Sequence, residues 1–221
     1  MELKGKKLAF LGDSLTAGVG TPPPYENAFW RVLARRTGAV CQGDGQGGTR
    51  IAATPVPNPN QITDTWYFLT RVDNLDADAD AVVVFGGSND FGMAEVPLGS
   101  FDDRTLYSFY GALHRLCLKL LERFPTANIV FIPPLHRVDE DNCTAQNSLT
   151  DRLPHRLIEY RNAILAVMEY YAIPVLDLYA TSGIQPRVPI TRETLMPDGV
   201  HPNEVGYERL AARVEGFLRT L

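Results

Sequence analysis

The sequence lacks long apolar runs, and this absence excludes one class of protein. No stretch approaches the roughly 18 uninterrupted apolar residues that a membrane-spanning helix needs. The apolar run near the N-terminus, Leu8 to Leu11, is far too short for the core of a signal peptide. We therefore expect a cytoplasmic protein that does not enter a membrane.

Cysteine is scarce, and its spacing indicates no covalent or metal framework. Cys41, Cys117 and Cys143 are odd in number and show no CxxC spacing. Neither a disulfide framework nor a zinc site is therefore indicated. Reduced thiols fit a reducing compartment, in agreement with a cytoplasmic location.

Basic residues are too few to form a nucleic-acid surface. The 221 residues carry 21 lysines and arginines against 26 aspartates and glutamates, so the formal net charge is -5. Binding of a polyanion needs clustered basic side chains that replace counterions, and we expect no nucleic-acid partner. The composition is 45% hydrophobic and neither repeats nor linkers interrupt it, so residues 1–221 are expected to form one soluble domain.

What the sequence does contain is an alternation of short β-rich runs with helical stretches. Apolar residues recur at helical spacing within 113–121, 160–171 and 210–221, and the first of these places Cys117 in the core. Such alternation predicts a three-layer α/β/α sandwich with a parallel sheet, whose ligands bind at the carboxyl ends of the strands. The five predicted strands are Leu8 to Leu11, Ala39 to Cys41, Ala81 to Phe85, Asn128 to Ile132 and Ile173 to Leu176.

A serine lies just beyond the first predicted strand, where a nucleophile would meet a ligand. The segment Gly12-Asp13-Ser14-Leu15 follows that strand, and its small residues allow a sharp turn and close approach of a carbonyl group. The alternative is that Ser14 only caps a helix, since serine is a favoured N-cap residue. Position alone leaves both interpretations open.

Glycines follow the second predicted strand and allow two interpretations. Gly43, Gly45 and Gly48 formally match the GxGxxG pattern of dinucleotide-binding proteins. That pattern should follow the first strand and open a long helix, whereas here prolines at 55, 57 and 59 interrupt the chain soon afterwards. We favour the second interpretation, in which a glycine N–H of this turn faces developing negative charge.

Two further segments deliver polar groups to the same edge of the sheet. Asn89 follows the third strand and can donate two side-chain N–H groups to an oxyanion, although such residues also bond their own backbone in turns. Asp198 stands three residues before His201, so its carboxylate can reach Nδ1 and leave Nε2 free to accept a proton. A lone histidine at a helix start is usually a cap or a surface residue, and the acidic partner argues against that here.

The other three histidines are weaker candidates. His114 lies within a predicted helix, where a solvated face is the expectation, and His155 has a surface position as its default. His136 follows the fourth strand and could contact a substrate at the same edge.

Four separated motifs, taken together and in order, resemble those of one family. The chain is similar to the SGNH hydrolases, also called GDSL-type esterases, lipases and acylhydrolases, and the similarity extends over most of its length. The motifs are Gly12-Asp13-Ser14-Leu15, the glycine turn at Gly47, Gly87-Ser88-Asn89-Asp90 and Asp198-Gly199-Val200-His201.

The resemblance implies a role for each motif residue. Ser14 would attack an ester carbonyl, His201 would transfer the proton and Asp198 would orient His201. The oxyanion would be held by the Ser14 and Gly47 amides and the Asn89 side chain, with Gly48 as a second candidate for the glycine amide. The resemblance also implies a flavodoxin-like sandwich without metal or cofactor. Further candidates for contact with the substrate are Asp13, Gly48, Ser88 and His136.

The sequence thus predicts a serine esterase that hydrolyses short acyl esters, with acetyl as the leading candidate, of a small or carbohydrate alcohol. Little chain remains outside the predicted sheet and helices to build an apolar acyl tunnel, and the candidate lid at 139–148 is polar. Thioesterase or lysophospholipase activity is the alternative within the family. A non-catalytic α/β ligand-binding domain and a phosphate- or flavin-binding domain are alternatives outside it. The sequence does not indicate an oligomeric state.

Overall fold

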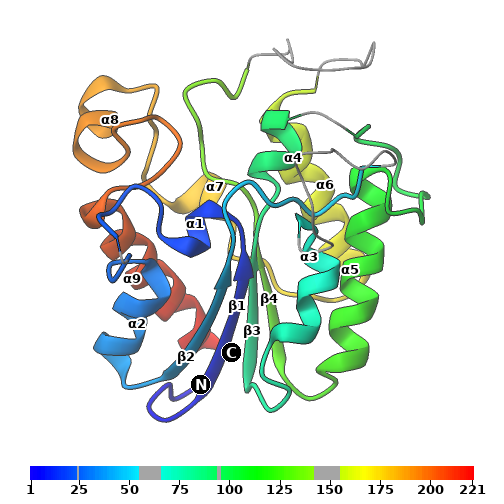
Figure 1. The fold of residues 1–221 in the computed structure, drawn as a ribbon, viewed down its shortest axis with the longest axis horizontal. Helices are drawn as coiled ribbons and strands as arrows, with labels where there is room; N and C mark the ends of the chain where they lie inside the picture. Colours follow the sequence, from blue (N-terminus) through cyan, green and yellow to red (C-terminus); the bar gives the residue numbers. More distant parts are fainter. Residues whose placement is uncertain (24, 55–65, 94–95, 142–154) are drawn as a thin grey trace.

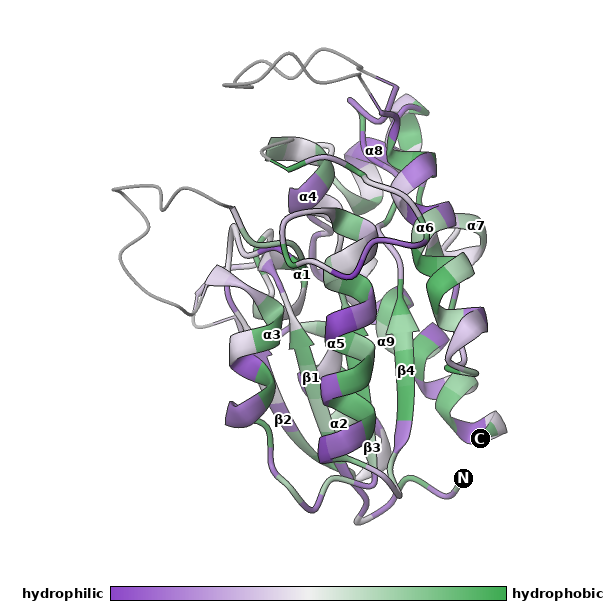
Figure 2. Cartoon of the chain, turned by 90° about the vertical axis from the view of Figure 1, so that its right-hand side faces the viewer, coloured by the Kyte–Doolittle hydropathy of each residue, from purple (hydrophilic) through white to green (hydrophobic). Residues whose placement is uncertain are grey.

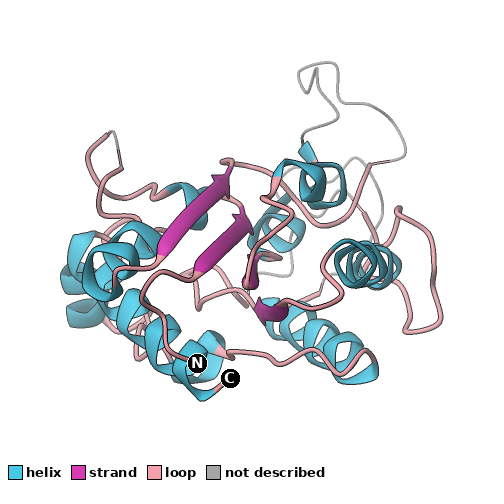
Figure 3. Cartoon of the chain, turned by 90° about the horizontal axis from the view of Figure 1, so that it is seen from below, coloured by secondary structure: helices cyan, strands magenta, loops and turns pink. Residues whose placement is uncertain are grey.

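The computed structural model describes residues 1–23, 25–54, 66–93, 96–141 and 155–221 and contains a parallel sheet between two layers of helices (Figures 1 and 3). The sheet has the strand order β2-β1-β3-β4, and all neighbouring strands are parallel. The strands are β1 (Lys7–Gly12), β2 (Val40–Gly45), β3 (Ala81–Phe85) and β4 (Asn128–Ile132). This is the predicted α/β/α sandwich.

The central strands are apolar on both faces because helices cover both. Val82 and Val84 of β3 pack into one core cluster, whereas Ala81, Val83 and Phe85 pack into the other. Side chains of a strand alternate between faces, so each strand contributes to two cores. Figure 2 shows the resulting contrast between the largely hydrophobic strands β1, β3 and β4 and the helices, which carry hydrophilic bands.

Long amphipathic helices form the two outer layers (Figure 1). One face of the sheet is covered by α2 (Phe29–Thr37) and α9 (Glu204–Thr220), and the other by α3 (Phe68–Arg71), α5 (Phe109–Arg123) and α6 (Leu157–Tyr170). The 3-10 turn η2 (Val72–Asn74) continues α3. None of the helices in the described part of the chain is long and apolar enough to cross a membrane.

The carboxyl end of the sheet carries short helices and loops (Figure 1). The connection through α2 leads from β1 to β2 on one side, and the chain then passes to β3 on the other side of β1. In sheets of this topology the crevice beyond the carboxyl ends, at the point where the strand order reverses, is the usual ligand site. The short helices are α1 (Ser14–Ala17), α4 (Ser88–Met93), α7 (Leu178–Thr181) and α8 (Pro189–Leu195).

The prediction of a fifth strand is wrong in its extent. The segment Ile173 to Leu176 is reduced to a single parallel bridge between Val175 and Phe131. Phe131 N–H donates to Pro174 at 3.1 Å and Leu176 N–H donates to Phe131 at 2.9 Å. Pro174 itself has no N–H group, so it cannot extend the ladder. The sheet of the described residues therefore has four strands, with this segment along the free edge of β4.

Two predictions about the second strand and His114 also need correction. The strand predicted at 39–41 extends over Val40–Gly45, so Gly43 and Gly45 lie within the sheet and not in a phosphate-binding loop. His114 is fully buried in α5, where its ring nitrogens lie 3.1 Å from the Tyr171 hydroxyl and 2.9 Å from the Phe101 carbonyl. Polar partners on a neighbouring helix and loop, invisible in the local pattern, allow this burial. Cys117 lies in the core as predicted.

Candidate active site

Ser14 is the first residue of α1, directly after the carboxyl end of β1. The preceding residue, Asp13, is the N-cap of this short helix, and its Oδ1 accepts a hydrogen bond from Leu15 N–H at 2.9 Å. The cap satisfies one of the free amides of the first turn. Within the described part of the chain, the N–H of Ser14 itself has no hydrogen-bond partner.

His201 reaches Ser14 from the turn between α8 and α9. Its Nε2 lies 2.9 Å from Ser14 Oγ, although the two residues are 187 positions apart in sequence. Its Nδ1 lies 2.7 Å from Asp198 Oδ2. With Nδ1 protonated, the imidazole donates to Asp198 and accepts the Ser14 O–H, which is the arrangement of a serine hydrolase triad.

The turn that carries Asp198 is held together by the same carboxylate. Asp198 Oδ1 accepts hydrogen bonds from Val200 N–H at 2.8 Å and from His201 N–H at 2.7 Å. Burial acts to raise the pKa of the Asp198 carboxyl, but the two backbone N–H groups and the imidazole outweigh it and hold the pKa below its usual range. Asp198 therefore stays ionised and fixed while it faces His201.

The glycine turn after β2 lies next to Ser14. A Cβ atom added to Gly47 would lie 3.9 Å from Ser14 Cβ, and no residue of the described chain accepts a hydrogen bond from Gly47 N–H. Gly48 has φ +78°, and a Cβ there would come within 3.0 Å of the Trp66 ring. Of the two glycines, Gly47 is thus the one beside the serine, and Gly48 allows the tight turn.

Asn89 stands at the start of α4 and faces this glycine turn. Its Nδ2 donates one hydrogen bond to the Thr49 carbonyl at 2.9 Å. The amide carries a second N–H, and no residue in the described ranges accepts a hydrogen bond from it. The bond to Thr49 thus ties Asn89 to the glycine turn whose Gly47 lies beside Ser14.

The other three candidates for substrate contact are occupied by the protein itself. Asp13 is 1% exposed and caps α1, and Ser88 is 5% exposed and accepts a hydrogen bond from Arg137 at 3.1 Å. His136 is half-buried, its Nδ1 lies 2.6 Å from Glu140 Oε2, and its ring lies 3.8 Å from the Tyr179 ring between centroids, tilted by 38°. These partners hold the three side chains in place, and their contact with a substrate stays a prediction.

The sequence analysis did not predict that Asp13 and Asp90 are buried beneath the site. Burial raises the pKa of Asp13 to about 7 and that of Asp90 to about 6. Asp90 accepts hydrogen bonds from Ile51 N–H at 3.1 Å and Ala52 N–H at 2.9 Å, which ties the glycine segment to α4. The Gly87-Ser88-Asn89-Asp90 motif contains Asp90, but no local pattern indicates its partners. No three metal-ligating side chains cluster in the described ranges.

Comparisons with known proteins show the family and the fold of the chain. A model of the GDSL-like lipase/acylhydrolase family matches residues 10–209. No curated protein matches the chain. One crystal structure is of a protein 35% identical, with a TM-score of 0.84, and covers 100% of this chain and 99% of its own.

Two further solved structures have lower sequence identity. A protein from Lactobacillus plantarum is 28% identical with a TM-score of 0.81, over 99% of this chain and 98% of its own. A lipase/acylhydrolase from Enterococcus faecalis is 20% identical with a TM-score of 0.68, over 97% and 96%. At 20% identity, the similarity to the Enterococcus faecalis protein shows a shared fold only.

Proposed function

Because the chain belongs to the GDSL-like lipase/acylhydrolase family, which implies ester hydrolysis, we propose that it is a serine esterase with Ser14 as its nucleophile. The observation that carries the proposal is the continuous contact from Ser14 Oγ through the His201 ring to Asp198, with distances of 2.9 and 2.7 Å. A non-catalytic ligand-binding domain would not require a serine, an imidazole and a carboxylate in this order.

The first half of the reaction forms an acyl-enzyme. Ser14 Oγ attacks the ester carbonyl carbon while His201 Nε2 takes the hydroxyl proton, and Asp198 stabilises the resulting imidazolium. The carbonyl oxygen becomes an oxyanion that accepts hydrogen bonds from Ser14 N–H, Gly47 N–H and the free N–H of Asn89. Collapse of this intermediate expels the alcohol, which receives the proton from His201.

The second half releases the acid. Water enters, His201 takes one of its protons, and the oxygen attacks the acyl carbon bound to Ser14. The same three N–H groups hold the second oxyanion, and its collapse returns the proton to Ser14 Oγ. The backbone amides of Ser14 and Gly47, which have no acceptor among the described residues, support this assignment, because donors that face the reacting centre need no rearrangement during the reaction.

We propose that the acyl group is short, with acetyl the leading candidate and a carbohydrate or other small alcohol as the second half. Each buried CH₂ contributes about 0.8 kcal/mol, so a long acyl chain is favoured only where an apolar tunnel receives it. The helices at the carboxyl end of the sheet, α1, α4, α7 and α8, are four to seven residues long, so they offer little length to enclose a long acyl chain. The polar lid predicted at 139–148 lies outside the described residues from position 142 onward.

An active-site phosphonate tests the central claim. A p-nitrophenyl alkylphosphonate should label the wild-type protein once, on the peptide that contains Ser14, and should abolish hydrolysis of p-nitrophenyl acetate. The His201→Gln variant should react far more slowly, because the hydroxyl is no longer activated. Labelling elsewhere, or none, would contradict the assignment.

The acyl group is tested separately with acetate, butyrate, octanoate and palmitate esters of one alcohol. We expect kcat/KM to be highest for acetate or butyrate and to fall for longer chains. A rise through octanoate and palmitate would support a lysophospholipase or lipase, and preference for an acyl thioester over its oxygen ester would support a thioesterase. Ser14 would remain the nucleophile in each case.

A further inference from the structure

Arg71 is a fully buried arginine whose guanidinium joins three segments of the candidate active site. It belongs to α3 and is 1% exposed. Its Nη1 donates to the Gly12 carbonyl at 3.1 Å and to Thr49 Oγ1 at 2.9 Å. Its Nη2 donates to the Asp44 carbonyl and, at 2.9 Å, to Asp44 Oδ1. The arginine thus links the ends of β1 and β2 to the glycine turn.

Thr49 connects Arg71 to the two other proposed oxyanion donors, the Gly47 amide and the Asn89 side chain. Its hydroxyl accepts from Arg71 and donates to the Gln46 carbonyl at 2.7 Å, which closes the turn around Gly47. Its own carbonyl accepts the Nδ2 hydrogen bond of Asn89. Gln46 N–H donates to the Gly12 carbonyl at 3.1 Å, so the turn is also bonded to the strand end before Ser14.

From these contacts we infer that Arg71 and Thr49 are positioning residues that set the spacing between the Gly47 amide, the Asn89 amide and Ser14. Neither touches the reacting atoms. The inference rests on the proposed function, because it concerns the oxyanion donors of that same site. It identifies two residues outside the four family motifs as necessary for the turnover rate.

The chemistry of the two side chains suits this role. A guanidinium presents several N–H groups in a rigid plane and can bind carbonyls of different segments at once, whereas an ammonium acts as a point charge. Its charge is balanced by Asp44, and a charged donor makes a stronger hydrogen bond than a neutral one. Buried groups with several partners have little freedom to move, so the amides that they hold are preorganised.

Thr49→Val tests the inference, because valine keeps the shape and removes both hydrogen bonds of the hydroxyl. A displacement on the order of 1 Å at a catalytic group can cost about 10²-fold in rate, so we expect kcat to fall about 10- to 100-fold. Thr49→Ser retains the hydroxyl and should restore most of the activity. Thr37→Val is the matched control, since the buried Thr37 hydroxyl also makes two hydrogen bonds, to Leu33 and Ala39, at the opposite end of the sheet.

Inhibitor binding separates positioning from a general structural role. A short alkylboronic acid forms a tetrahedral adduct with the nucleophile, whereas a neutral ether analogue of the substrate binds without an adduct and has no carbonyl oxygen for the oxyanion donors. Loss of oxyanion geometry should raise Ki for the boronic acid by about the same factor as kcat/KM falls and leave Ki for the ether analogue within about twofold. Circular dichroism checks the fold. If Thr49→Val does not fold, Arg71→Lys is measured in the same way.

The outcomes are distinguishable from failure of the proposed function. Wild-type turnover in Thr49→Val, or equal weakening of both inhibitors, would overturn the positioning role while labelling of Ser14 still stood. Absence of Ser14 labelling in the wild-type protein would overturn the proposed function itself. A selective loss of boronic acid binding, recovered in Thr49→Ser, would support both.

Discussion

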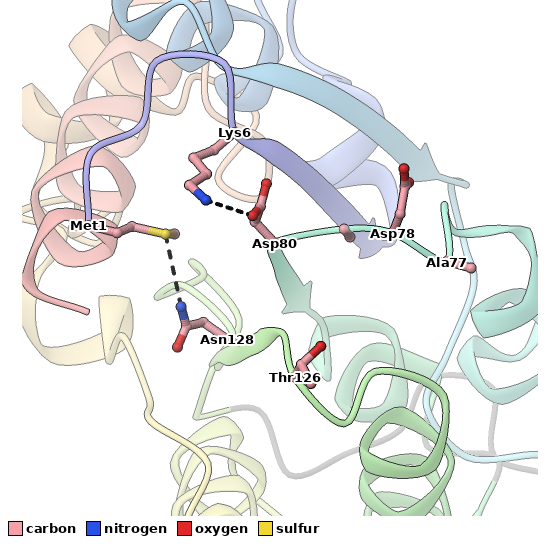
Figure 4. A pocket seen from close by; sticks show the side chains of 8 residues that line it. Met1, Lys6, Ala77, Asp78, Asp80, Thr126 and Asn128 are labelled. Carbon is pink, nitrogen blue, oxygen red and sulfur yellow. Dashed lines mark hydrogen bonds and ion pairs between the residues drawn. The ribbon is translucent and has the colours of Figure 1, made fainter.

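The two ends of the sheet both carry aspartates and basic residues, yet they place them in opposite environments. At the amino end, Lys6 and Asp80 pair at 2.8 Å with 45% and 34% of their side chains exposed. They line an open hollow of about 370 Å³ with Asp78, Thr126 and Asn128 (Figure 4). At the carboxyl end, Asp13 and Asp90 are each 1% exposed.

The difference in burial between the two ends of the sheet shifts the pKa values of their aspartates in opposite directions. The Lys6 ammonium and the Lys7 N–H hold the pKa of Asp80 below its usual range, against a small effect of burial. At the other end, burial dominates and raises the pKa of Asp13 to about 7. Water screens the charges in the polar hollow, so they stabilise a transition state only weakly. Buried and fixed charges and dipoles are screened less and can stabilise the charge that develops during a reaction. The largest effects of substitution should therefore lie at the carboxyl end.

Replacement of Ser14 should have the largest effect. We expect Ser14→Ala to lower kcat/KM by on the order of 10⁴-fold or more, because the nucleophile is lost while the fold remains. Ser88→Ala is the comparison, since Ser88 follows β3 and its hydroxyl bonds Arg137. It should retain substantial activity on p-nitrophenyl acetate. A dead Ser88→Ala enzyme beside an active Ser14→Ala enzyme would reverse the assignment.

Asn89→Asp should have the next largest effect, and on turnover more than on binding. Loss of one oxyanion donor typically costs about 10²–10³-fold in kcat, and a carboxylate in its place adds repulsion. The same substitution also loses the hydrogen bond to the Thr49 carbonyl. Steady-state kinetics should show a lower kcat with KM little changed. An unchanged kcat would exclude Asn89 from the oxyanion site.

The predictions above rest on motifs that could be found in the sequence, since parallel strands bring their carboxyl ends to one edge. Ser14, the glycine turn and Asn89 each follow a predicted strand, and the spacing of Asp198 and His201 is local. Partners from distant segments could not be predicted in this way. The contacts of Arg71 with the ends of β1 and β2, and those of His114 with Tyr171, depend on how helices pack against loops.

Local composition also led to two wrong predictions, the end of β2 and the fifth strand. The β2 strand was predicted to end at residue 41 because glycines resemble a loop, yet Gly43 and Gly45 continue the strand. A Cβ at Gly43 would lie 2.3 Å from the Trp30 ring, and one at Gly45 would lie 2.2 Å from Ala17 N. These glycines therefore serve close packing within the sheet. The prediction of the fifth strand was wrong for the opposite reason. Its run of apolar residues is typical of a strand, but Pro174 lacks the N–H group that a longer ladder needs.

Asp13→Asn should change the pH dependence of stability. The raised pKa means that the folded protein binds a proton more tightly than the unfolded chain, so wild-type stability falls as pH rises from about 4 to about 7. We expect a decrease of about 1–3 kcal/mol between pH 5 and pH 8 in urea unfolding. In Asp13→Asn the decrease in stability should be smaller, because only Asp90 still contributes to it. The Asp90 contribution is complete once the pH has risen past its pKa of about 6. An unchanged profile would mean that Asp13 is ionised without penalty.

Asp80→Asn, the same substitution at the amino end, should have the smallest effect and the opposite sign. The lowered pKa of Asp80 means that its contribution to stability is present at neutral pH and is lost as pH falls below about 4. Exposed ion pairs contribute about 1 kcal/mol or less, and about a third of this side chain is exposed.

Urea unfolding at pH 7 should therefore show a slight destabilisation in Asp80→Asn that vanishes at pH 3 and shrinks in 1 M salt, since salt screens exposed charges. The kcat for p-nitrophenyl acetate should stay at the wild-type value, because the hollow lies at the amino ends of β1, β3 and β4, whereas Ser14 follows the carboxyl end of β1. A marked loss of turnover in Asp80→Asn would mean that the amino end of the sheet contributes to activity. Equal effects of Asp80→Asn and Asp13→Asn at every pH would remove burial as the cause of the contrast between the two ends.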